Sequence, residues 1–435
     1  MKEKTLLGML GLILIVAVAI SCGARDEQFS SSTGIDELVG LSPQCDPDIF
    51  DSSRLVGDIK PGEELKVLLV KACDAARYPL ILPASQKVRI TLSGSPEIPA
   101  LYVYGPGIRG LFTDVISTES GKPATLEFTP DIAGEYYVIA ATSDRTGPAY
   151  FHLKAECLEN CNLKATRYPI VMVHGFSGFS SIGPIDYFYK VKDTFAPMGY
   201  DLHIAVLAPY NSTVDVRGPE LAAFVDEVLE ETYANKINII AHSQGGVDSR
   251  FIISSPNYKY GDRVGMLNMI ATPNYGTPIA DIALENWGVE WLMEILFKIF
   301  GIVIEDPKQL HDLKASLNQL SVKTMVGDFN PNYPDDPQVR YKSWAGYSCF
   351  TLVKGCHNPV NPLLIPSWSL IYSWKGGTID NDGIVPTDSA KWTGFQKVID
   401  ADHFAEVGQL LGMTGNFKYL DFYQNIIEAM VAEGY

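Results

Sequence analysis

A strand, a tight turn and a helix follow one another within residues 237–253, and this succession limits the possible folds more than any other feature. Residues 237–240 are almost all apolar, which is typical of a buried strand. The turn at 241–245 has the pattern small-x-Ser-x-Gly, in which the serine backbone is strained and the residues two positions away must be small. The succession predicts a strand-turn-helix unit with Ser243 on the turn as a nucleophile.

The chain from residue 165 to residue 435 repeats the alternation of short apolar strands with amphipathic helices. Clear examples are the strand at 169–173, the helix at 220–229 and the strand at 264–271. Strands that are apolar on both sides belong to parallel sheets that helices cover on both faces. We therefore expect an α/β domain over 165–435.

Residues 39–160 have a different character and predict an all-β, sandwich-like domain. Polar and apolar residues alternate, and glycines and prolines separate the apolar runs, as in short strands joined by turns. The segment 129–138 resembles the closing hairpin of small jelly-roll modules that are appended to secreted bacterial enzymes. Such a domain is either a spacer or a module that binds substrate or a surface. The strand runs are 87–92, 101–104, 125–128 and 136–140.

The first residues predict an export signal over 1–21. An apolar run from Leu6 to Ile20 follows a charged start, and it is shorter than the roughly 20 residues of a membrane span. Ser21-Cys22 resembles a lipoprotein processing box, so we expect cleavage before Cys22, acylation of that cysteine and a tether over 22–38. The alternatives are a cleaved secretory signal or an uncleaved anchor. More than one acyl chain would hold the protein on a membrane.

The cysteine content agrees with export. Of seven cysteines, six remain once Cys22 is set apart, and an even set is typical of disulfides in an oxidising compartment. Proximity favours the pairs Cys157–Cys161 and Cys349–Cys356. A metal site at Cys157 is disfavoured because no second cysteine or histidine pair stands at ligand spacing.

The charge balance argues against a nucleic-acid partner. The chain has 34 basic and 51 acidic residues, with no basic stripe and no glycine-rich phosphate loop. We expect no nucleic acid to bind.

A nucleophilic serine needs a base, and in this fold order the base follows the serine in the chain. The histidines after Ser243 are His311, His357 and His403. His311 falls in a polar helix and His357 adjoins a cysteine, whereas His403 follows a predicted last strand. We therefore expect His403 to be the base.

The acid that orients the base is expected at Asp382. It precedes His403 by an interval that suits one strand and a loop, and a glycine and two apolar residues follow it. Asp380 is the nearby alternative.

The oxyanion formed in acyl transfer needs preorganised N–H donors. The strand at 169–173 ends in the loop 174–178, and the backbone N–H of Phe176 is the expected donor from it. The backbone N–H of Gln244, at the start of a helix, is the second, and the helix dipole adds to its effect. We do not expect His174 to act as a base.

Over residues 168–435 the chain resembles the secreted bacterial triacylglycerol lipases. The resemblance implies an α/β-hydrolase without a cofactor, with Ser243, Asp382 and His403 as catalytic triad. It rests on ordered matches at 168–175, 216–218, 239–246, 271–277, 339–344, 381–386 and 403–412.

One departure from these lipases concerns their structural calcium ion. They place an aspartate two residues after the catalytic histidine, where this chain has Ala405, and another well before the catalytic aspartate. No Asp or Glu lies between Trp344 and Asp380, and only Gln409 remains of the pattern. A calcium ion held without carboxylates would bind weakly, so we expect no metal. A Cys349–Cys356 bridge is an alternative brace for this region.

The segment at about 284–304 predicts an amphipathic helix with a charged stripe. Its position between the strand after Ser243 and the acid is where the lipase family keeps its lid, and Trp287 and Trp291 suit a lipid boundary. A buried core helix is the alternative.

Together these features predict hydrolysis of lipid acyl esters through an acyl-enzyme by a protein that Cys22 anchors to a membrane. A short-chain esterase or an acyltransferase on the same scaffold is the near alternative. A non-catalytic surface lipoprotein that binds lipid is the distant one. The lipase resemblance also allows a dedicated folding chaperone, which the sequence does not identify.

Overall fold

The computed structural model describes residues 45–107, 110–176, 181–182, 185–207, 213–285, 307–350, 357–378 and 380–435. The predicted signal peptide, tether and acylation site at Cys22 lie outside these residues, and so does almost all of the predicted lid at 284–304. Of the helices in these ranges, none is both long enough and apolar enough to cross a bilayer.

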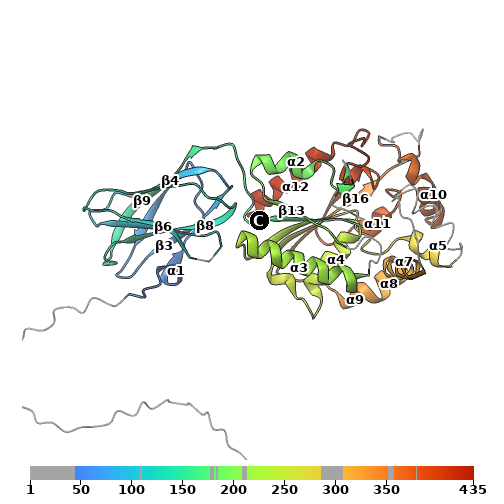
Figure 1. The fold of residues 1–435 in the computed structure, drawn as a ribbon, viewed down its shortest axis with the longest axis horizontal. Coiled ribbons are helices and arrows are strands. Elements are labelled where there is room, and N and C mark those ends of the chain that lie inside the picture. The colour runs from blue at the N-terminus through green and yellow to red at the C-terminus, as the bar shows by residue number, and fades with distance from the viewer. Residues whose placement is uncertain are drawn as a thin grey trace, which may run out of the picture. The chain divides into compact units, whose positions relative to one another are not determined.

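The N-terminal part of the described chain forms a two-sheet β-sandwich, as the strand alternation predicts (Figure 1). One sheet has the order β1-β3-β8-β5-β6 and the other β2-β9-β4-β7, and apart from the parallel β1–β3 pair all neighbours are antiparallel. In β4 the apolar residues Val88, Ile90 and Leu92 are buried between the sheets, because alternate side chains of a strand face opposite sides. The elements are α1 (Ile49–Ser52), β1 (Arg54–Leu55), β2 (Glu64–Leu69), β3 (Ala76–Leu82), β4 (Lys87–Ser93), β5 (Pro99–Tyr104), β6 (Leu111–Ile116), β7 (Ala124–Phe128), β8 (Gly134–Thr142) and β9 (Ala149–Glu159).

The prediction of a hairpin at 129–138 is wrong. β7 pairs with β4 in one sheet, whereas β8 pairs with β3 and β5 in the other. The segment therefore carries the chain from one sheet to the other. Alternation in sequence reveals which face of a strand is buried, but it does not reveal the partner strand.

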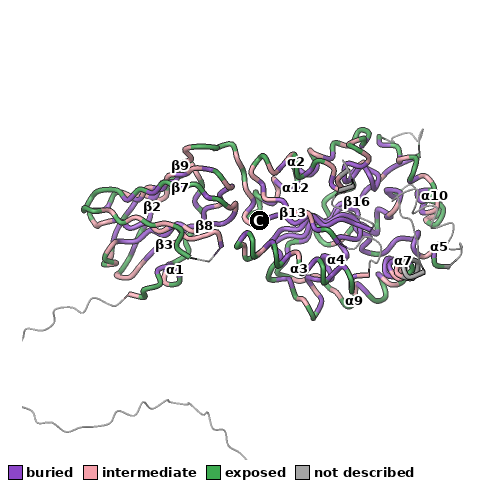
Figure 2. Tube along the Cα trace, viewed as in Figure 1, coloured by how far each residue is buried: buried purple, intermediate pink, exposed green. Residues whose placement is uncertain are grey.

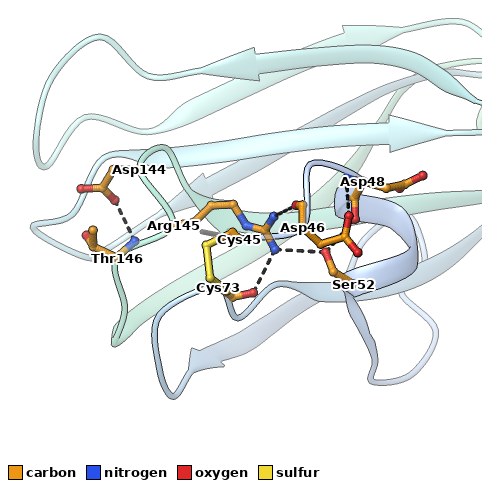
Figure 3. Close-up of a disulfide and its surroundings, with 8 residues drawn as sticks. All are labelled: Cys45, Asp46, Asp48, Ser52, Cys73, Asp144, Arg145 and Thr146. Carbon is orange, nitrogen blue, oxygen red and sulfur yellow. Dashed lines mark hydrogen bonds between the residues drawn. A yellow bond between two sulfur atoms is a disulfide. The ribbon is translucent and has the colours of Figure 1, made fainter. Parts of the chain in front are cut away.

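Two disulfides are described in this part of the chain. Cys157–Cys161 is present as proximity predicts, and Cys45 is bonded to Cys73. The Arg145 guanidinium braces the second bridge by donating to the carbonyl oxygens of Asp46 at 2.6 Å and Cys73 at 2.9 Å (Figure 3). The disulfides indicate an extracellular or periplasmic protein.

Cys349 is also disulfide-bonded, and its predicted partner Cys356 lies outside the described residues. The pairing of these two cysteines stays a prediction.

The rest of the described chain is built on a parallel sheet in the order β13-β10-β14-β15-β16-β17. Its inner strands are buried on both sides (Figure 2), as their continuous apolar sequence predicts. The strands are β10 (Ile170–Val173), β13 (Leu202–Ala205), β14 (Ile237–His242), β15 (Val264–Ile270), β16 (Arg340–Tyr347) and β17 (Phe395–Asp400), and the short strands β11 (Ser181–Ile182) and β12 (Ile185–Asp186) pair with each other.

Helices cover both faces of this sheet (Figure 1). Val171 and Val173 of β10 pack with α3 and α4, whereas Ile170 and Met172 pack with α2 and α12 on the opposite face. The alternation of strands and helices predicts this helix-covered parallel sheet, and the fold is that of an α/β-hydrolase, as the lipase resemblance implies. The helices are α2 (Val191–Phe195), α3 (Val214–Thr232), α4 (Gln244–Ser254), α5 (Pro278–Glu285), α7 (Pro307–Leu320), α8 (Val322–Thr324), α9 (Asn330–Asn332), α10 (Ile365–Trp374), α11 (Thr387–Ala390) and α12 (Tyr419–Glu433).

Candidate active site

Ser243 occupies the turn between β14 and α4. Its backbone has φ 56° and ψ −128°, a conformation that costs free energy for any residue with a Cβ. The Ser243 N–H donates to the carbonyl oxygen of Ile270 at 2.9 Å, which holds the turn against the neighbouring strand β15. The strand, turn and helix predicted at this serine are therefore present, with the strain that such a turn requires.

Glycine is required on the helix side of the turn. A Cβ on Gly245 would lie 2.5 Å from the carbonyl oxygen of Val173 and 2.7 Å from that of His174. A Cβ on Gly246 would overlap the side chain of Thr272. The two glycines thus let α4 start directly against the ends of the neighbouring strands.

Three side chains from distant parts of the sequence form one line of hydrogen bonds. Ser243 Oγ lies 3.0 Å from His403 Nε2, and His403 Nδ1 lies 2.9 Å from Asp382 Oδ2. All three residues are buried. Because the carboxylate can only accept, the imidazole carries its proton on Nδ1, which leaves Nε2 free to accept the serine proton.

The carboxylate of Asp382 is fixed by the backbone around it. Its Oδ1 accepts from the N–H groups of Ile384 at 2.8 Å and Val385 at 2.7 Å. Its carbonyl oxygen accepts from the N–H of His403 at 3.0 Å, which joins the acid loop to the histidine loop. The carboxylate therefore takes part in three hydrogen bonds, one of them to the imidazole.

Of the three alternatives to Asp382 and His403 that the sequence offers, the side chains of two are described. Asp380 is exposed, and so is His357. The side chain of His311 lies outside the described residues.

The two expected oxyanion donors stand at the ends of adjacent parallel strands. Phe176 lies in the loop after β10, and Gln244 is the first residue of α4, directly after β14 and the serine. The N–H of Gly175 is turned away to donate to Tyr187 Oη at 3.0 Å. A Cβ on Gly175 would lie only 2.7 Å from Ser243 Cβ, so this loop closely approaches the serine.

Arg217 is a site residue whose role the sequence did not reveal. From the buried side of α3 it donates to Asp248 Oδ2 at 2.7 Å, to the His174 carbonyl at 2.7 Å and to the Gly175 carbonyl at 3.2 Å. Arg217 and Asp248 are both fully buried. The burial of Asp248 raises the pKa of its carboxyl to about 6, which the nearby guanidinium opposes. A buried ion pair thus fixes the carbonyl groups of His174 and Gly175. These residues belong to the segment 174–176 that carries the expected donor Phe176, which is named the oxyanion loop.

We expect Arg217→Met to lower the free energy of unfolding by about 3–5 kcal/mol, because it leaves the Asp248 carboxylate and the His174 carbonyl buried without their donor. Denaturant unfolding at pH 7.5 measures this change. Combining Arg217→Met with Asp248→Leu should recover part of the loss, since the uncompensated charge is then removed as well. A loss below about 1 kcal/mol in the single variant would contradict the role given to the ion pair.

Both ring nitrogens of His174 are engaged with the backbone. Its Nε2 accepts from the N–H of Leu207 at 2.9 Å, so Nδ1 carries the proton and faces the Gly175 carbonyl at 2.9 Å. Burial, together with the nearby Arg217 charge, lowers the pKa of His174 to about 3.

This shift predicts a pH dependence of stability. Below pH 6.5 the unfolded chain takes up a proton at His174 that the folded chain refuses until about pH 3, so falling pH favours unfolding. Relative to His174→Gln, the wild-type free energy of unfolding should therefore fall by up to about 1.4 kcal/mol per pH unit below pH 6.5. Denaturant unfolding of both proteins between pH 8 and pH 4 measures the difference, and parallel curves would contradict it.

A cluster of titratable groups lies beside the line of hydrogen bonds formed by Ser243, His403 and Asp382. The nearest ligand-type atoms of His242, His403 and Glu406 lie within 4.8 Å of one another. His242 Nε2 lies 2.9 Å from Glu406 Oε2, and His403 Nδ1 faces Asp382. A metal ion would therefore have to replace hydrogen bonds that are already formed.

The calcium site of the resembling lipases does not fit these residues. Ala405 offers no side-chain oxygen. The nearby carboxylate of Asp402 accepts from the backbone N–H groups of Asn361 at 2.6 Å, Ala405 at 2.8 Å and Phe404 at 3.1 Å. Gln409 donates to the carbonyl oxygen of Tyr187 at 3.1 Å. Backbone N–H groups thus already occupy the carboxylate of Asp402, the residue directly before His403.

Comparison with known proteins agrees with this architecture. The family model described as "Putative serine esterase (DUF676)" matches residues 169–309. A triacylglycerol lipase of Vibrio cholerae is 28% identical over 289 residues, which cover 61% of this chain and 87% of that lipase. A triacylglycerol lipase of Pseudarthrobacter phenanthrenivorans is 30% identical over 226 residues, which cover 49% of this chain and 66% of that lipase.

Two solved structures are similar over part of the chain. The Bacillus licheniformis lipase BlEst2 in its mature form has 22% identity and a TM-score of 0.45, covering 60% of this chain and 92% of that one. The metagenomic carboxyl esterase MGS0156 has 15% identity and a TM-score of 0.49, covering 62% of this chain and 78% of that one. Taken with the helix-covered parallel sheet and the serine at its strained turn, the sequence relatives show that the protein is a carboxylic ester hydrolase with the α/β-hydrolase fold, similar in sequence to triacylglycerol lipases.

Proposed function

We propose that the protein hydrolyses acyl esters of lipids through an acyl-enzyme, with Ser243 as nucleophile, His403 as base and Asp382 as orienting acid. The observation that carries the proposal is the unbroken line of hydrogen bonds from Ser243 Oγ through His403 to Asp382. This line starts at a serine whose strained turn places it where two loops meet.

In the proposed first step, Ser243 Oγ attacks the carbonyl carbon of the ester while its proton passes to His403 Nε2. Asp382 stabilises the resulting imidazolium and keeps its Nδ1–H in place. The negative charge on the former carbonyl oxygen is stabilised by the backbone N–H groups of Phe176 and Gln244. His403 then gives the proton to the departing alkoxide, which leaves as the alcohol and yields the acyl-enzyme.

Water completes the reaction. The water oxygen attacks the acyl carbon while His403 Nε2 takes a proton from the water. A second tetrahedral oxyanion then forms at the backbone N–H groups of Phe176 and Gln244. Collapse of this intermediate breaks the bond to Ser243 Oγ, which recovers the proton from His403. The carboxylic acid is released and the enzyme returns to its starting state.

The choice of lipid esters is supported by the sequence relatives, which are triacylglycerol lipases of two bacteria. Emulsified triacylglycerols and p-nitrophenyl esters of increasing chain length test it, with and without a chelator. We expect turnover of the emulsion and of long-chain esters, and no effect of the chelator. Turnover restricted to short, dissolved esters would instead indicate an esterase, and transfer of the acyl group to an added alcohol in preference to water would indicate an acyltransferase.

The proposal includes anchoring to a membrane through acylated Cys22. Its support is the short apolar run that ends in Ser21-Cys22, together with a disulfide content that suits an exported protein. Fractionation of cells that express the full chain tests it. Cys22→Ser should move the esterase activity from the membrane fraction to the soluble fraction, and an unchanged distribution would contradict anchoring at this residue.

A further inference from the structure

We propose that Tyr187 and Glu406 are positioning residues for ester hydrolysis, which through His242 hold the oxyanion loop in register with the loop of the catalytic histidine. The inference rests on the proposed function of Ser243 and His403. It concerns polar side chains that do not touch the reacting atoms, and it assigns a role to the cluster beside the triad.

A continuous chain of hydrogen bonds joins the two loops. The Gly175 N–H donates to Tyr187 Oη at 3.0 Å, and Tyr187 Oη lies 2.7 Å from His242 Nδ1. His242 Nε2 lies 2.9 Å from Glu406 Oε2, and the same Oε2 lies 3.6 Å from His403 Nδ1. The chain thus begins at the residue before the expected oxyanion donor and ends beside the imidazole.

Each contact suits an uncharged His242. Burial and the neighbouring His403 hold the pKa of His242 well below its ordinary value, and burial beside two aspartates holds the pKa of Glu406 well above its own. With a carboxylate at Glu406, the tyrosine hydroxyl donates to Nδ1 and Nε2–H donates to the glutamate. With a protonated Glu406 both hydrogen bonds reverse, so the chain persists in either state.

At one end, the chain completes the support of the oxyanion loop. The carbonyl oxygens of His174 and Gly175 are held by Arg217, and the N–H of Gly175 is held by Tyr187. A Cβ on Gly175 would lie 2.7 Å both from Tyr187 Oη and from Ser243 Cβ. A shift of the tyrosine would therefore move the loop relative to the serine.

At the other end, Glu406 lies three residues after His403 in the same loop and is fully buried. Its Oε1 has no hydrogen-bond partner among the described residues, and it packs where a Cβ at position 346 would otherwise stand. A buried carboxyl group with an unsatisfied oxygen costs free energy, which a purely structural role could avoid with an apolar side chain. The imidazole rings of His242 and His403 lie 4.5 Å apart, so the chain also packs on the catalytic histidine.

Two further bonds tie the same segments together. The N–H of Tyr189 donates to the carbonyl oxygen of Val407 at 3.0 Å, and Gln409 donates to the carbonyl oxygen of Tyr187 at 3.1 Å. The segment that carries Tyr187 and the loop that carries His403 and Glu406 are therefore joined by backbone as well as by side chains.

The test compares kcat and KM for p-nitrophenyl butyrate in the full-length enzyme. Tyr187→Phe removes one oxygen atom and should lower kcat by about 10–100-fold with KM changed less than about threefold, because a small misplacement of reacting groups is enough for such a loss. Glu406→Leu should do the same, and Glu406→Gln, which keeps an acceptor for His242, should recover most of the loss. If the residues act as one chain, the double variant Tyr187→Phe/Glu406→Leu should be no slower than the slower single variant.

Tyr423→Phe is the matched control. Tyr423 is a fully buried tyrosine in the core cluster against which Tyr187 packs, and its hydroxyl has no hydrogen-bond partner among the described residues, so Tyr423→Phe should break no hydrogen bond within that part of the chain. Its kcat should match that of the wild type. Equal kcat values for Tyr187→Phe and Tyr423→Phe would overturn the proposal, even if Glu406→Leu does not fold.

Two other results would also overturn it. Losses in the single variants that multiply in the double variant would mean independent roles, and a fall in Tm with unchanged kcat would mean a structural role. Labelling by a fluorophosphonate keeps this test separate from the proposed function. An unlabelled wild type would remove Ser243 as nucleophile, whereas a labelled wild type with unimpaired Tyr187→Phe would remove only the positioning role.

Discussion

Replacing Ser243 by alanine is expected to lower kcat for p-nitrophenyl butyrate by about a million-fold, the size of loss typical when the nucleophile of a serine hydrolase is removed. The alanine lacks the Oγ that lies 3.0 Å from His403 Nε2, so no acyl-enzyme can form. The residual rate would come from the oxyanion donors and from substrate binding, which remain. Steady-state kinetics measures the loss, and mass spectrometry after fluorophosphonate treatment should find no label.

Ser255→Ala provides the control. Ser255 is a buried serine just beyond the end of α4. Ser255→Ala therefore removes a hydroxyl near the same helix, but one that makes no contact with His403. It should keep wild-type kcat and should still be labelled at Ser243. An active Ser243→Ala enzyme, or label on another residue of the wild type, would contradict the proposed nucleophile.

The meeting of Ser243, Asp382 and His403 could be predicted because of the architecture. Ser243 follows β14, and His403 follows β17, one of the last strands of the same parallel sheet. The carboxyl ends of parallel strands lie along one edge of a sheet, so the residues after them meet although about 160 positions of sequence separate them. The sequence already favoured Asp382 over Asp380, because a glycine and two apolar residues follow Asp382, and the structure places the Asp382 carboxylate 2.9 Å from His403 Nδ1.

The residues that support the site could not be predicted in the same way. Arg217, Tyr187 and Glu406 come from a helix, a loop and the turn after His403, and each makes its contact across the fold. A sequence pattern reveals which residues are apolar and with what period, but not which polar group finds a partner in the interior. A buried charge such as Arg217 would be assigned to the surface by composition alone.

The pairing of strands in the β-sandwich was also only partly predictable from the sequence. The sequence pattern predicted the four strands β4, β5, β7 and β8, yet the segment between β7 and β8 crosses between sheets, where a hairpin was expected. The choice of partner strand depends on contacts between residues far apart in sequence, such as the buried side chains of Val88 and Phe128, which are paired across β4 and β7.

Asp382→Asn is expected to lower kcat by about 10⁴-fold. The backbone around position 382 determines the orientation of the asparagine amide, and this orientation causes the loss. Oδ1 of the aspartate accepts from the N–H groups of Ile384 and Val385, so the asparagine oxygen must take that position. The amide NH₂ then replaces Oδ2 and faces His403 Nδ1. An N–H donor at this point requires Nδ1 to accept, which moves the imidazole proton to Nε2.

An imidazole with its proton on Nε2 cannot take the proton of Ser243, so the loss should appear in kcat while KM and Tm remain close to wild type. Asp380→Asn is the control, because Asp380 is exposed and its change should leave kcat unaltered. Kinetics between pH 6 and pH 9 separates this effect from misfolding, since partial recovery at high pH would indicate that only the proton position is wrong. A loss smaller than about tenfold would mean that another acceptor orients the imidazole, and the nearest described carboxylate for that role is Glu406, 3.6 Å from Nδ1.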